Sequence, residues 1–432
     1  MQITKECEKT NLRVIPQDWD LKKVGEFADV TAGGTPSTFN STYWNGNIRW
    51  MNSGELNLKK IFEVDGRITE SGLKNSSTQM LPSKCVLIGL AGQGKTRGTV
   101  AINYVKLCTN QSICAVIPND SFIPEYLYHN LDSRYNELRK LSTGEGGRGG
   151  LNLTIIRNIE VPLPTKEEQS AITQVLSDTD ALIESLDRLI EKKKNIKQGA
   201  MQELLSGKKR LSGWEFNKFQ STDVGIIPAD WKVENILENS TLKARIGWQG
   251  LTTAEYLDSG NFQLVTGTDF KKGKIAWETC VFVDYKRYAQ DRNIQLKIGD
   301  ILVTKDGTIG KVAYVNALHL PATLNSGVFV IRPKERAYFP LFLYYILTSA
   351  YFTRFLNKLA AGSTINHLYQ KDFSSFNFIV PAYAEQEEIA KAFFAMDLEI
   401  EALEQKRDKY KQLKVGLMQQ LLTGRIRLKC KN

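Results

Sequence analysis

A long internal repeat constrains the fold of this chain more than any other feature of its sequence. Residues 164–211 align with residues 381–428 at an offset of 217 positions, and the alignment needs no gap. About 18 of the 48 aligned positions are identical, among them Glu168-Gln169 and its copy Glu385-Gln386. Chance does not produce such agreement, so the chain is expected to consist of two equivalent halves.

Both repeated segments have the apolar spacing of a long helix that packs against another helix. In the first segment, one heptad position holds Ile172, Thr179, Leu186 and Ala200, and the other holds Val175, Leu182, Leu189 and Ile196. In the second segment, one heptad position holds Ile389, Met396, Leu403, Tyr410 and Leu417, flanked by Phe393 and Ile400. A helix of about 40 residues is ~60 Å long, which is too long for an ordinary amphipathic helix packed on its own domain. Because the chain must return to reach the second helix, we predict an antiparallel coiled coil.

A block of mixed α and β character precedes each long helix. Short β-like runs are predicted at residues 48–51, 85–88, 100–102 and 113–117, and again at 262–265, 301–304, 312–315 and 328–331. Each series is followed by a helix that opens with proline, at residues 124–141 and 340–359, and by a final strand, at residues 155–161 and 376–380. The predicted fold class is therefore α+β, with mixed domains at residues 14–163 and 226–380 and helical spacers at residues 164–211 and 381–428.

One stretch of the first block, Gly89 to Thr96, fits the P-loop pattern letter by letter. A working P-loop requires a helix directly after its Lys-Thr pair, so that backbone amides hold the phosphates. Here Arg97, Gly98 and a strand follow instead, and the equivalent place in the second block keeps strand, turn and strand without the motif. We interpret both places as hairpin turns and keep a nucleotide-binding P-loop protein as an alternative.

Several basic residues lie where a nucleic acid could be contacted. The candidates at the two turns and in the glycine-rich segment 144–150 are Lys95, Arg97, Arg148, Lys305 and Lys311. The chain has a net charge of +10 and an isoelectric point near 9.1, which favours an anionic partner. Solvated charge at turn tips is the alternative interpretation of these residues.

Apart from the P-loop-like stretch, the sequence contains no recognisable catalytic, cofactor-binding or metal-binding motif. Its six cysteines form no Cys-x-x-Cys pair and are expected to be free and mostly buried thiols, and its three histidines are far apart. No signal peptide is visible, and no apolar run reaches the ~20 residues of a membrane span, so we expect a cytoplasmic protein without membrane contact.

The blocks and the repeat together resemble the specificity subunit of type I restriction–modification systems. The first block contains Ala32-Gly33-Gly34-Thr35-Pro36-Ser37, Tyr43-Trp44 and Ile48-Arg49-Trp50, similar to the opening of that family's target-recognition domain. The second block, with Tyr256, Gly260 and Gly267-Thr268-Asp269, is similar to the other common opening. Both long segments end in Met-Gln-x-Leu-Leu-Ser/Thr-Gly, as the family's helical spacers do. The resemblance extends from about Val14 to Leu428.

The resemblance implies that each block reads one half of a bipartite site in double-stranded DNA. It also implies that the helices set the half-site spacing and dock two methyltransferase subunits, which bind S-adenosylmethionine and methylate adenine. The chain itself would then catalyse nothing, and whether motor-nuclease subunits join the complex is left open. Because the two blocks differ in sequence, the site is expected to be asymmetric. A coiled-coil scaffold without a role in DNA binding is the remaining alternative.

Overall fold

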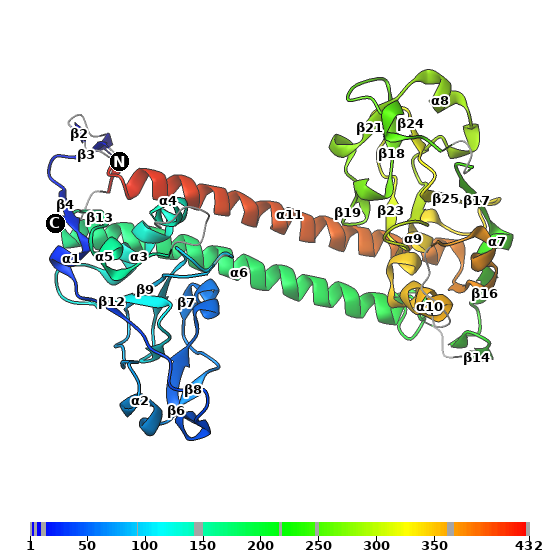
Figure 1. Ribbon diagram of the computed structural model, residues 1–432. Helices are drawn as coiled ribbons and strands as arrows, with labels where there is room; N and C mark the ends of the chain where they lie inside the picture. Colours follow the sequence, from blue (N-terminus) through cyan, green and yellow to red (C-terminus); the bar gives the residue numbers. More distant parts are fainter. Residues whose placement is uncertain are drawn as a thin grey trace. The chain divides into compact units, whose positions relative to one another are not determined.

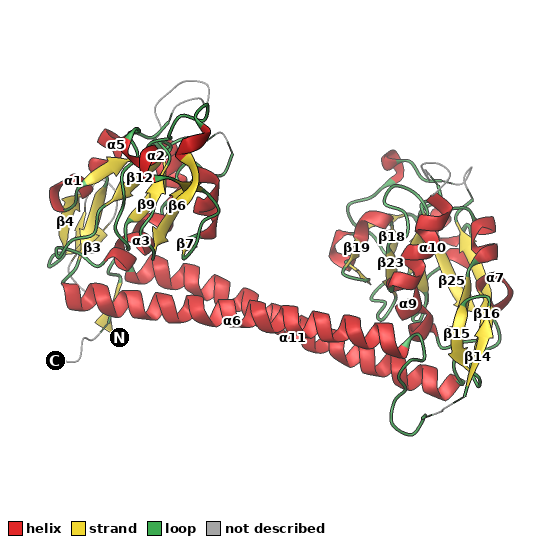
Figure 2. Ribbon diagram, turned by 90° about the horizontal axis from the view of Figure 1, so that it is seen from below, coloured by secondary structure: helices red, strands yellow, loops and turns green. Residues whose placement is uncertain are grey.

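The computed structural model of the protein describes residues 2–3, 7–9, 14–92, 94–141, 150–215, 218–246, 250–360 and 367–428. The chain forms two compact units, one of residues 1–187 and 404–432 and one of residues 188–403. Two 39-residue helices, α6 (Lys166–Leu204) and α11 (Tyr383–Leu421), contribute residues to both units (Figures 1 and 2). Each unit therefore contains one mixed domain together with a part of each long helix.

A five-stranded sheet forms the centre of the first domain. Its strands lie in the order β5 (Val30–Ala32), β12 (Ile113–Val116), β9 (Val86–Gly89), β10 (Val100–Asn103) and β7 (Lys60–Ile61). Strand β9 pairs antiparallel with both of its neighbours, whereas β10 and β7 are parallel. All residues of β9, β10 and β12 are buried, because both faces of the sheet are covered, and this explains their nearly continuous apolar sequences.

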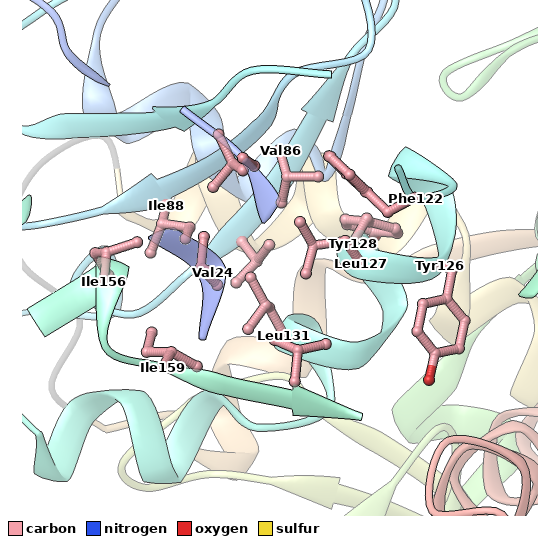
Figure 3. Packing of buried hydrophobic residues seen from close by; sticks show 14 of the residues in the cluster. Val24, Val86, Ile88, Phe122, Tyr126, Leu127, Tyr128, Leu131, Ile156 and Ile159 are labelled. Atoms are coloured by element: carbon pink, nitrogen blue, oxygen red, sulfur yellow. The ribbon is translucent and has the colours of Figure 1, made fainter. Parts of the chain in front are cut away.

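Helices and a separate two-stranded sheet build the core on one face of this sheet. They are α1 (Val24–Phe27), α3 (Pro124–Asp132), α4 (Tyr135–Lys140), α5 (Leu153–Arg157) and the pair β4 (Asp20–Lys23) with β13 (Glu160–Leu163). Helix α3 begins with proline, which is tolerated where no intrahelical donor is needed, and it packs Leu127 and Leu131 in one cluster with Val86 and Ile88 (Figure 3). The Tyr126 hydroxyl donates to the Pro162 carbonyl oxygen at 2.7 Å, which ties α3 to β13.

A smaller sheet lies against the opposite face of the central sheet, where Leu87 and Ala101 pack with Met51 and Leu56. Its strands lie in the order β11 (Cys108–Thr109), β6 (Trp44–Met51) and β8 (Arg67–Ile68), and helix α2 (Glu70–Lys74) follows β8. We call this three-stranded sheet, with the helix that follows it, the outer lobe of the domain.

The second domain repeats this plan. Its central sheet has the order β17 (Ser240–Ala244), β25 (Val328–Pro333), β22 (Ile301–Thr304) and β23 (Val312–Tyr314), and β16 (Lys232–Asn235) pairs with β26 (Asn377–Val380) in a separate two-stranded sheet. Its outer lobe consists of β21 (Val281–Val283), β18 (Phe262–Val265), β24 (Ala322–Leu324) and helix α8 (Tyr285–Ala289). Further strands and a short helix are β1 (Gln2–Ile3), β2 (Cys7–Lys9), β3 (Val14–Pro16), β14 (Phe219–Thr222), β15 (Gly225–Pro228), α7 (Ile236–Asn239), β19 (Phe270–Lys271), β20 (Lys274–Ile275) and β27 (Ile426–Arg427).

The predicted strands are found at their expected places, with one exception, and each of the two helices predicted within the blocks is divided into two. Residues 155–161 are not one strand, because Asn152 caps helix α5 by accepting from the Ile155 amide at 2.9 Å, and strand β13 starts only at Glu160. The expected helix at 340–359 is interrupted at Ser349, whose extended backbone ends α9 (Pro340–Thr348) and whose hydroxyl accepts from the Tyr351 amide in α10 (Ala350–Ala360). In the same way, the helix at 124–141 is divided into α3 and α4.

The two long helices run antiparallel, as predicted. In the first unit, Lys414 forms an ion pair with Asp180 at 2.5 Å and Arg407 forms one with Asp187 at 3.3 Å. In the second unit, Lys193 pairs with Glu399 at 2.6 Å and Lys197 pairs with Asp397 at 2.5 Å. Residue numbers along α11 fall as those along α6 rise, which defines the antiparallel direction within each unit.

The predicted heptad phase of α6 is wrong at one of its two positions. Leu189 and Ile196 are 38% and 49% exposed, and Leu182 is only half-buried. The buried residues lie one position further on, at Leu176, Ile183 and Ile190, in phase with the correctly assigned Ile172 and Leu186. Several of these neighbours are both apolar, so the sequence allowed either phase. In α11, Ile389, Phe393 and Ile400 are buried, and Met396, Leu403, Tyr410 and Leu417 are half-buried, as the predicted phase requires.

Candidate nucleic-acid interface

The P-loop-like sequence from Gly89 to Thr96 connects two antiparallel strands, so its interpretation as a hairpin turn is confirmed. Strand β9 ends at Gly89 and β10 begins at Val100, and the Gly98 amide donates to the Gly89 carbonyl oxygen at 2.9 Å. Side chains of α4 donate hydrogen bonds to carbonyl oxygens of the turn. Arg139 donates to Gly94 at 2.6 Å and Tyr135 to Lys95 at 3.0 Å.

The turn places one of its two basic candidates in solvent. The Lys95 side chain is exposed, whereas Arg97 is half-buried and belongs to the packed base of the turn. The Thr99 hydroxyl donates to the Lys95 carbonyl oxygen at 2.6 Å, which fixes the backbone beneath the lysine. Arg148, predicted as part of a basic loop, lies outside the described residues.

The corresponding turn of the second domain connects β22 and β23, which are also antiparallel. Lys311 is exposed, whereas Lys305 is half-buried and its ammonium lies 5.6 Å from the centre of the Phe329 ring. The Lys305 carbonyl oxygen accepts from the Leu368 amide at 2.9 Å, and the Asp306 carboxylate contacts Nδ1 of His367. Each domain thus presents one exposed lysine at an equivalent turn, Lys95 in the first and Lys311 in the second.

Charged contacts join the first domain to the helix residues of its own unit. Lys60, at the edge strand β7, forms ion pairs with Asp180 at 3.6 Å and with Glu184 at 3.3 Å. Asp180 also forms an ion pair with Lys414 of α11, so its carboxylate contacts both the domain and the second helix. We call the group of Lys60, Asp180, Glu184 and Lys414 the first joint.

The second unit has an equivalent joint at positions related by the repeat. Lys274 of β20 pairs with Glu401 at 2.6 Å, and Asp397 pairs with Lys197 and accepts from the Tyr345 hydroxyl at 2.8 Å. Glu401, Asp397 and Lys197 are the residues that the 217-position offset matches to Glu184, Asp180 and Lys414. Sequence reasoning missed Lys60 and Lys274, because neither belongs to the repeat.

A second repeated contact fixes each domain opening to a helix end of the same unit. In the first unit, Arg427 donates to Glu168 and, through two bonds of 2.9 Å, to Asp18, while its guanidinium lies 5.6 Å from the Trp19 ring centre. The bond to Arg427 lowers the pKa of Asp18. We call this arrangement the arginine clamp. The Ile-Pro-x-Asp-Trp openings and the Gly-x-x-Arg helix ends were the visible sequence signals for it.

The second arginine clamp is more deeply buried. Arg210 donates to Glu385, whose side chain is fully buried, at 2.8 Å from Nε, and to Asp230 at 3.0 and 2.8 Å. Burial raises the pKa of Glu385, and the bonds from Arg210 oppose that rise. Burial alone therefore disfavours the charge of Glu385, and Arg210 compensates it.

A glutamine side chain near the start of each long helix forms hydrogen bonds with the backbone of neighbouring segments. Gln169 accepts from the Ile123 amide and donates to the Pro164 carbonyl oxygen, both at 2.9 Å. Gln386 repeats this pattern with Phe339 at 2.8 Å and Pro381 at 2.9 Å. Both residues of the repeated Glu-Gln pair therefore have a structural role: the glutamate binds the clamp arginine, and the glutamine binds backbone groups.

Four cysteines and one histidine are buried in the domains. The described cysteines 85, 108, 114 and 280 are free and buried, and burial raises the pKa of Cys108 to about 11 and of the others to about 12. Burial, and then the charge of Lys414, lowers the pKa of His129 to about 4. Among the described residues, no group of three or more histidine, cysteine, aspartate or glutamate residues could hold a metal ion. Within the same part of the chain, every helix is too short or too polar to cross a membrane.

Solved structures with the same arrangement of elements are found among specificity subunits. The crystal structure of the type I restriction–modification S subunit from M. genitalium superimposes with a TM-score of 0.61 at 17% identity, over 96% of this chain and 97% of that one. A second chain, from a structure that concerns complex assembly and conformational transition of the type I restriction–modification system, gives 0.55 at 16% identity, over 95% and 99%. At these identities, the likeness shows a shared fold.

Sequence comparison identifies the family. The type I restriction enzyme MjaVIII specificity subunit of Methanocaldococcus jannaschii is 26% identical over 430 residues, which cover 98% of this chain and 96% of that protein. The EcoR124I/EcoR124II specificity subunit of Escherichia coli is 26% identical over 183 residues, 41% of this chain and 45% of that protein. Residues 16–195 and 249–412 match the family described as the type I restriction modification DNA specificity domain. Because this match extends over well more than half of the chain, the protein belongs to the type I restriction–modification DNA specificity family.

Proposed function

We propose that this protein is the DNA-specificity subunit of a type I restriction–modification complex, and that each domain reads one half of a bipartite, asymmetric DNA site. One observation carries the proposal. The two domains share a fold and attach to helix residues through matching joints and clamps, but their outer lobes carry different side chains. Two domains that recognise different DNA sequences require the same attachment to the helices and different side chains in their outer lobes.

Affinity for DNA would come from contacts between basic side chains and phosphates, which do not depend on sequence. Lys95 and Lys311 are exposed at equivalent turns, Arg97 and Lys305 are half-buried in the same turns, and Arg148 belongs to the glycine-rich segment 144–150 of the sequence. The net charge of +10 supports this assignment. The sequence of the site would be read by other residues, at base edges.

The two long helices would fix the spacing between the half-sites and dock two methyltransferase subunits. Their buried heptad residues hold the helices together in each unit, whereas other apolar residues remain outside. The large apolar residues exposed on the helices are Leu189, Ile196, Leu398, Leu413 and Val415. In this proposal, S-adenosylmethionine and the catalytic groups belong to the methyltransferase, and the specificity subunit catalyses no step.

A domain exchange tests the proposal. Residues 24–159 would be replaced by the corresponding part of another specificity subunit, which keeps Asp18, Trp19 and Glu168 of the first clamp in place. The chain would be expressed with its methyltransferase in a host without adenine methylation, and the methylated sites would be read by sequencing. One half of the site should change and the other half should stay.

The matched control exchanges residues 236–376 and should change only the opposite half. The proposal fails if either exchange alters both halves, or if methylation disappears although the complex assembles. It also fails if the complex that contains the wild-type chain methylates no bipartite site.

A further inference from the structure

The helices α2 and α8 occupy equivalent positions in the outer lobes of the two domains. Strands β8 and β21 both pair antiparallel with the middle strand of their sheet, and α2 and α8 follow them directly. Both helices are capped in the same way. The Thr69 hydroxyl accepts from the Gly72 amide at 3.1 Å, and the Asp284 carboxylate accepts from the Arg287 amide at 2.7 Å.

The chemistry of the two helices differs although their positions match. Helix α2 has the sequence Glu-Ser-Gly-Leu-Lys, in which the charges cancel, whereas α8 has Tyr-Lys-Arg-Tyr-Ala, with two cations and two aromatic rings. Basic and aromatic side chains are the groups that bind phosphates and contact bases. Figure 1 shows α8 at the end of the second domain that is remote from α11.

The side chains at the start of α8 are exposed on a packed aromatic base. Tyr285 is 68% exposed, and Lys286 beside it is also exposed. Beneath them, the ring of Tyr288 stacks on Phe262 with centres 4.5 Å apart, and the Tyr285 ring lies 5.6 Å from the same phenylalanine. Such an arrangement presents a tyrosine and a lysine to solvent without leaving the helix free to move.

Polar contacts hold α8 from several sides. Arg287 donates to Glu255 from Nε at 2.7 Å, and Gln295 donates to the Tyr288 carbonyl oxygen at 3.2 Å. Arg245 donates to Gln290, directly after the helix, at 3.1 Å. A rigid support of this kind is required where side chains must meet base edges with a defined geometry.

Arg245 is an unusual support, because it is a buried cation. It is 1% exposed, and its other bonds end on neutral oxygens of Leu324 at 2.8 Å, Thr323 at 3.2 Å and Arg287 at 3.4 Å. Within the described part of the chain, no carboxylate forms an ion pair with Arg245, although Glu255 and Asp291 are near enough to oppose the lowering of its pKa by burial. Buried charges are normally paired, so the positive charge beneath α8 favours an anion on its outer side.

We propose that α8 is an element with which the second domain reads bases, that Tyr285 and Lys286 are specificity-determining residues, and that Arg245 is their positioning residue. This inference rests on the proposed function and names the part of the second domain that meets the DNA. The partner is duplex DNA, because the exposed groups and the buried guanidinium add positive charge at one place. The helix faces proposed to dock the methyltransferase belong to α6 and α11.

The test uses the full chain in complex with its methyltransferase. Once the site is known from methylation sequencing, three duplexes are prepared: the intact site, and the site with one or the other half scrambled. The ratio of the dissociation constants for scrambled and intact duplexes measures the specificity at each half. Tyr285→Ala and Lys286→Ala should each lower this ratio roughly tenfold at the half read by the second domain and leave the other ratio unchanged.

Two control variants match Lys286→Ala. Lys358→Ala removes an exposed lysine from α10 of the same domain, and Lys74→Ala removes one from α2 of the first domain. Neither should alter the ratio at the half read by the second domain. Arg245→Gln should lower that ratio as the α8 variants do, and Arg245→Lys should restore part of it. A purely structural role would instead lower the thermal midpoint without changing the ratio.

The inference is overturned if both α8 variants keep the wild-type ratio, or if they lower both ratios equally, which would indicate a contact to phosphate alone. The inference is also overturned if Lys358→Ala lowers the ratio at the half read by the second domain as much as Lys286→Ala does. A wild-type complex without specificity at either half would overturn the proposed function together with this inference.

Discussion

Removing Arg210 should destabilise the second unit strongly, because it leaves the carboxylate of Glu385 buried without a positive counter-charge. The Glu385 side chain is fully buried and Arg210 is the cation that binds it, whereas Asp230, the other partner, is 38% exposed. Breaking a buried ion pair from one side costs about 3–5 kcal/mol, and an exposed pair contributes at most ~1 kcal/mol. Arg210→Met should therefore cost about 3–5 kcal/mol of unfolding free energy, most of it through Glu385.

The pH dependence of this loss follows from the direction of the pKa shift. Burial raises the pKa of Glu385, and Arg210 opposes the rise, so the variant should have a still higher pKa at this position. A carboxyl group with a raised pKa in the folded state binds more protons when folded, so stability falls as the pH rises from the unfolded to the folded pKa. The stability that Arg210→Met loses at pH 7 should therefore be partly recovered near pH 5.

Urea unfolding of the full chain, followed by tryptophan fluorescence at pH 7 and pH 5, measures both effects. Trp231 reports on the site, because the Arg210 guanidinium lies 5.8 Å from its ring centre. The matched control is Lys209→Met, which removes an exposed ion pair with Glu203 and should cost less than ~1 kcal/mol. The double variant Arg210→Met/Glu385→Leu should recover most of the loss. A cost for Arg210→Met no larger than that of the control, or one that does not depend on pH, would refute the reasoning.

Three further outcomes follow from the proposed function. The assembled complex should lose about 10³-fold in affinity for random DNA between 50 and 200 mM salt if about six phosphates are contacted, and a flat response would favour a scaffold without a DNA role. Lys95→Ala and Lys311→Ala should each weaken DNA binding in a gel-shift titration, whereas ATP binding that is lost in Lys95→Ala would restore the P-loop alternative. Inserting seven helix-forming residues at matching points of α6 and α11 adds ~10 Å to each helix and should widen the gap between methylated half-sites by at most about three base pairs. An unchanged gap would exclude the helices as the spacer.

The repeat allowed much of the architecture to be predicted, because it is a property of the whole chain. It located both long helices, and the requirement that the chain return gave their antiparallel direction. The P-loop-like stretch was interpreted correctly because Gly98 and the apolar run after it cannot form the helix that a phosphate site needs. The strands of the central sheets were predictable since they are buried on both faces and their sequences are continuously apolar.

What could not be predicted depends on contacts between distant residues. Leu189 and Ile190 are both apolar, and only the partner helix decides which of them is buried. Lys60 and Lys274 are ordinary lysines in sequence, and their roles come from carboxylates more than 120 residues away. The same is true of Arg245, whose burial nothing in its neighbouring residues indicates.

The participation of the chain's last segment in the first unit has a consequence for the order of folding during synthesis. The core of that unit contains Met418, Leu421 and Leu422, and Arg427 closes its clamp, so the first 187 residues leave the ribosome without part of their own interior. The second unit is continuous in sequence, from Arg188 to Leu403, and can be completed before them. At roughly 5–20 residues per second, synthesis of the roughly 240 residues between Asp187 and Arg427 takes about 12–48 s, and the first unit waits that long for its missing helix end. The half of the protein that is made first is therefore the half that is finished last.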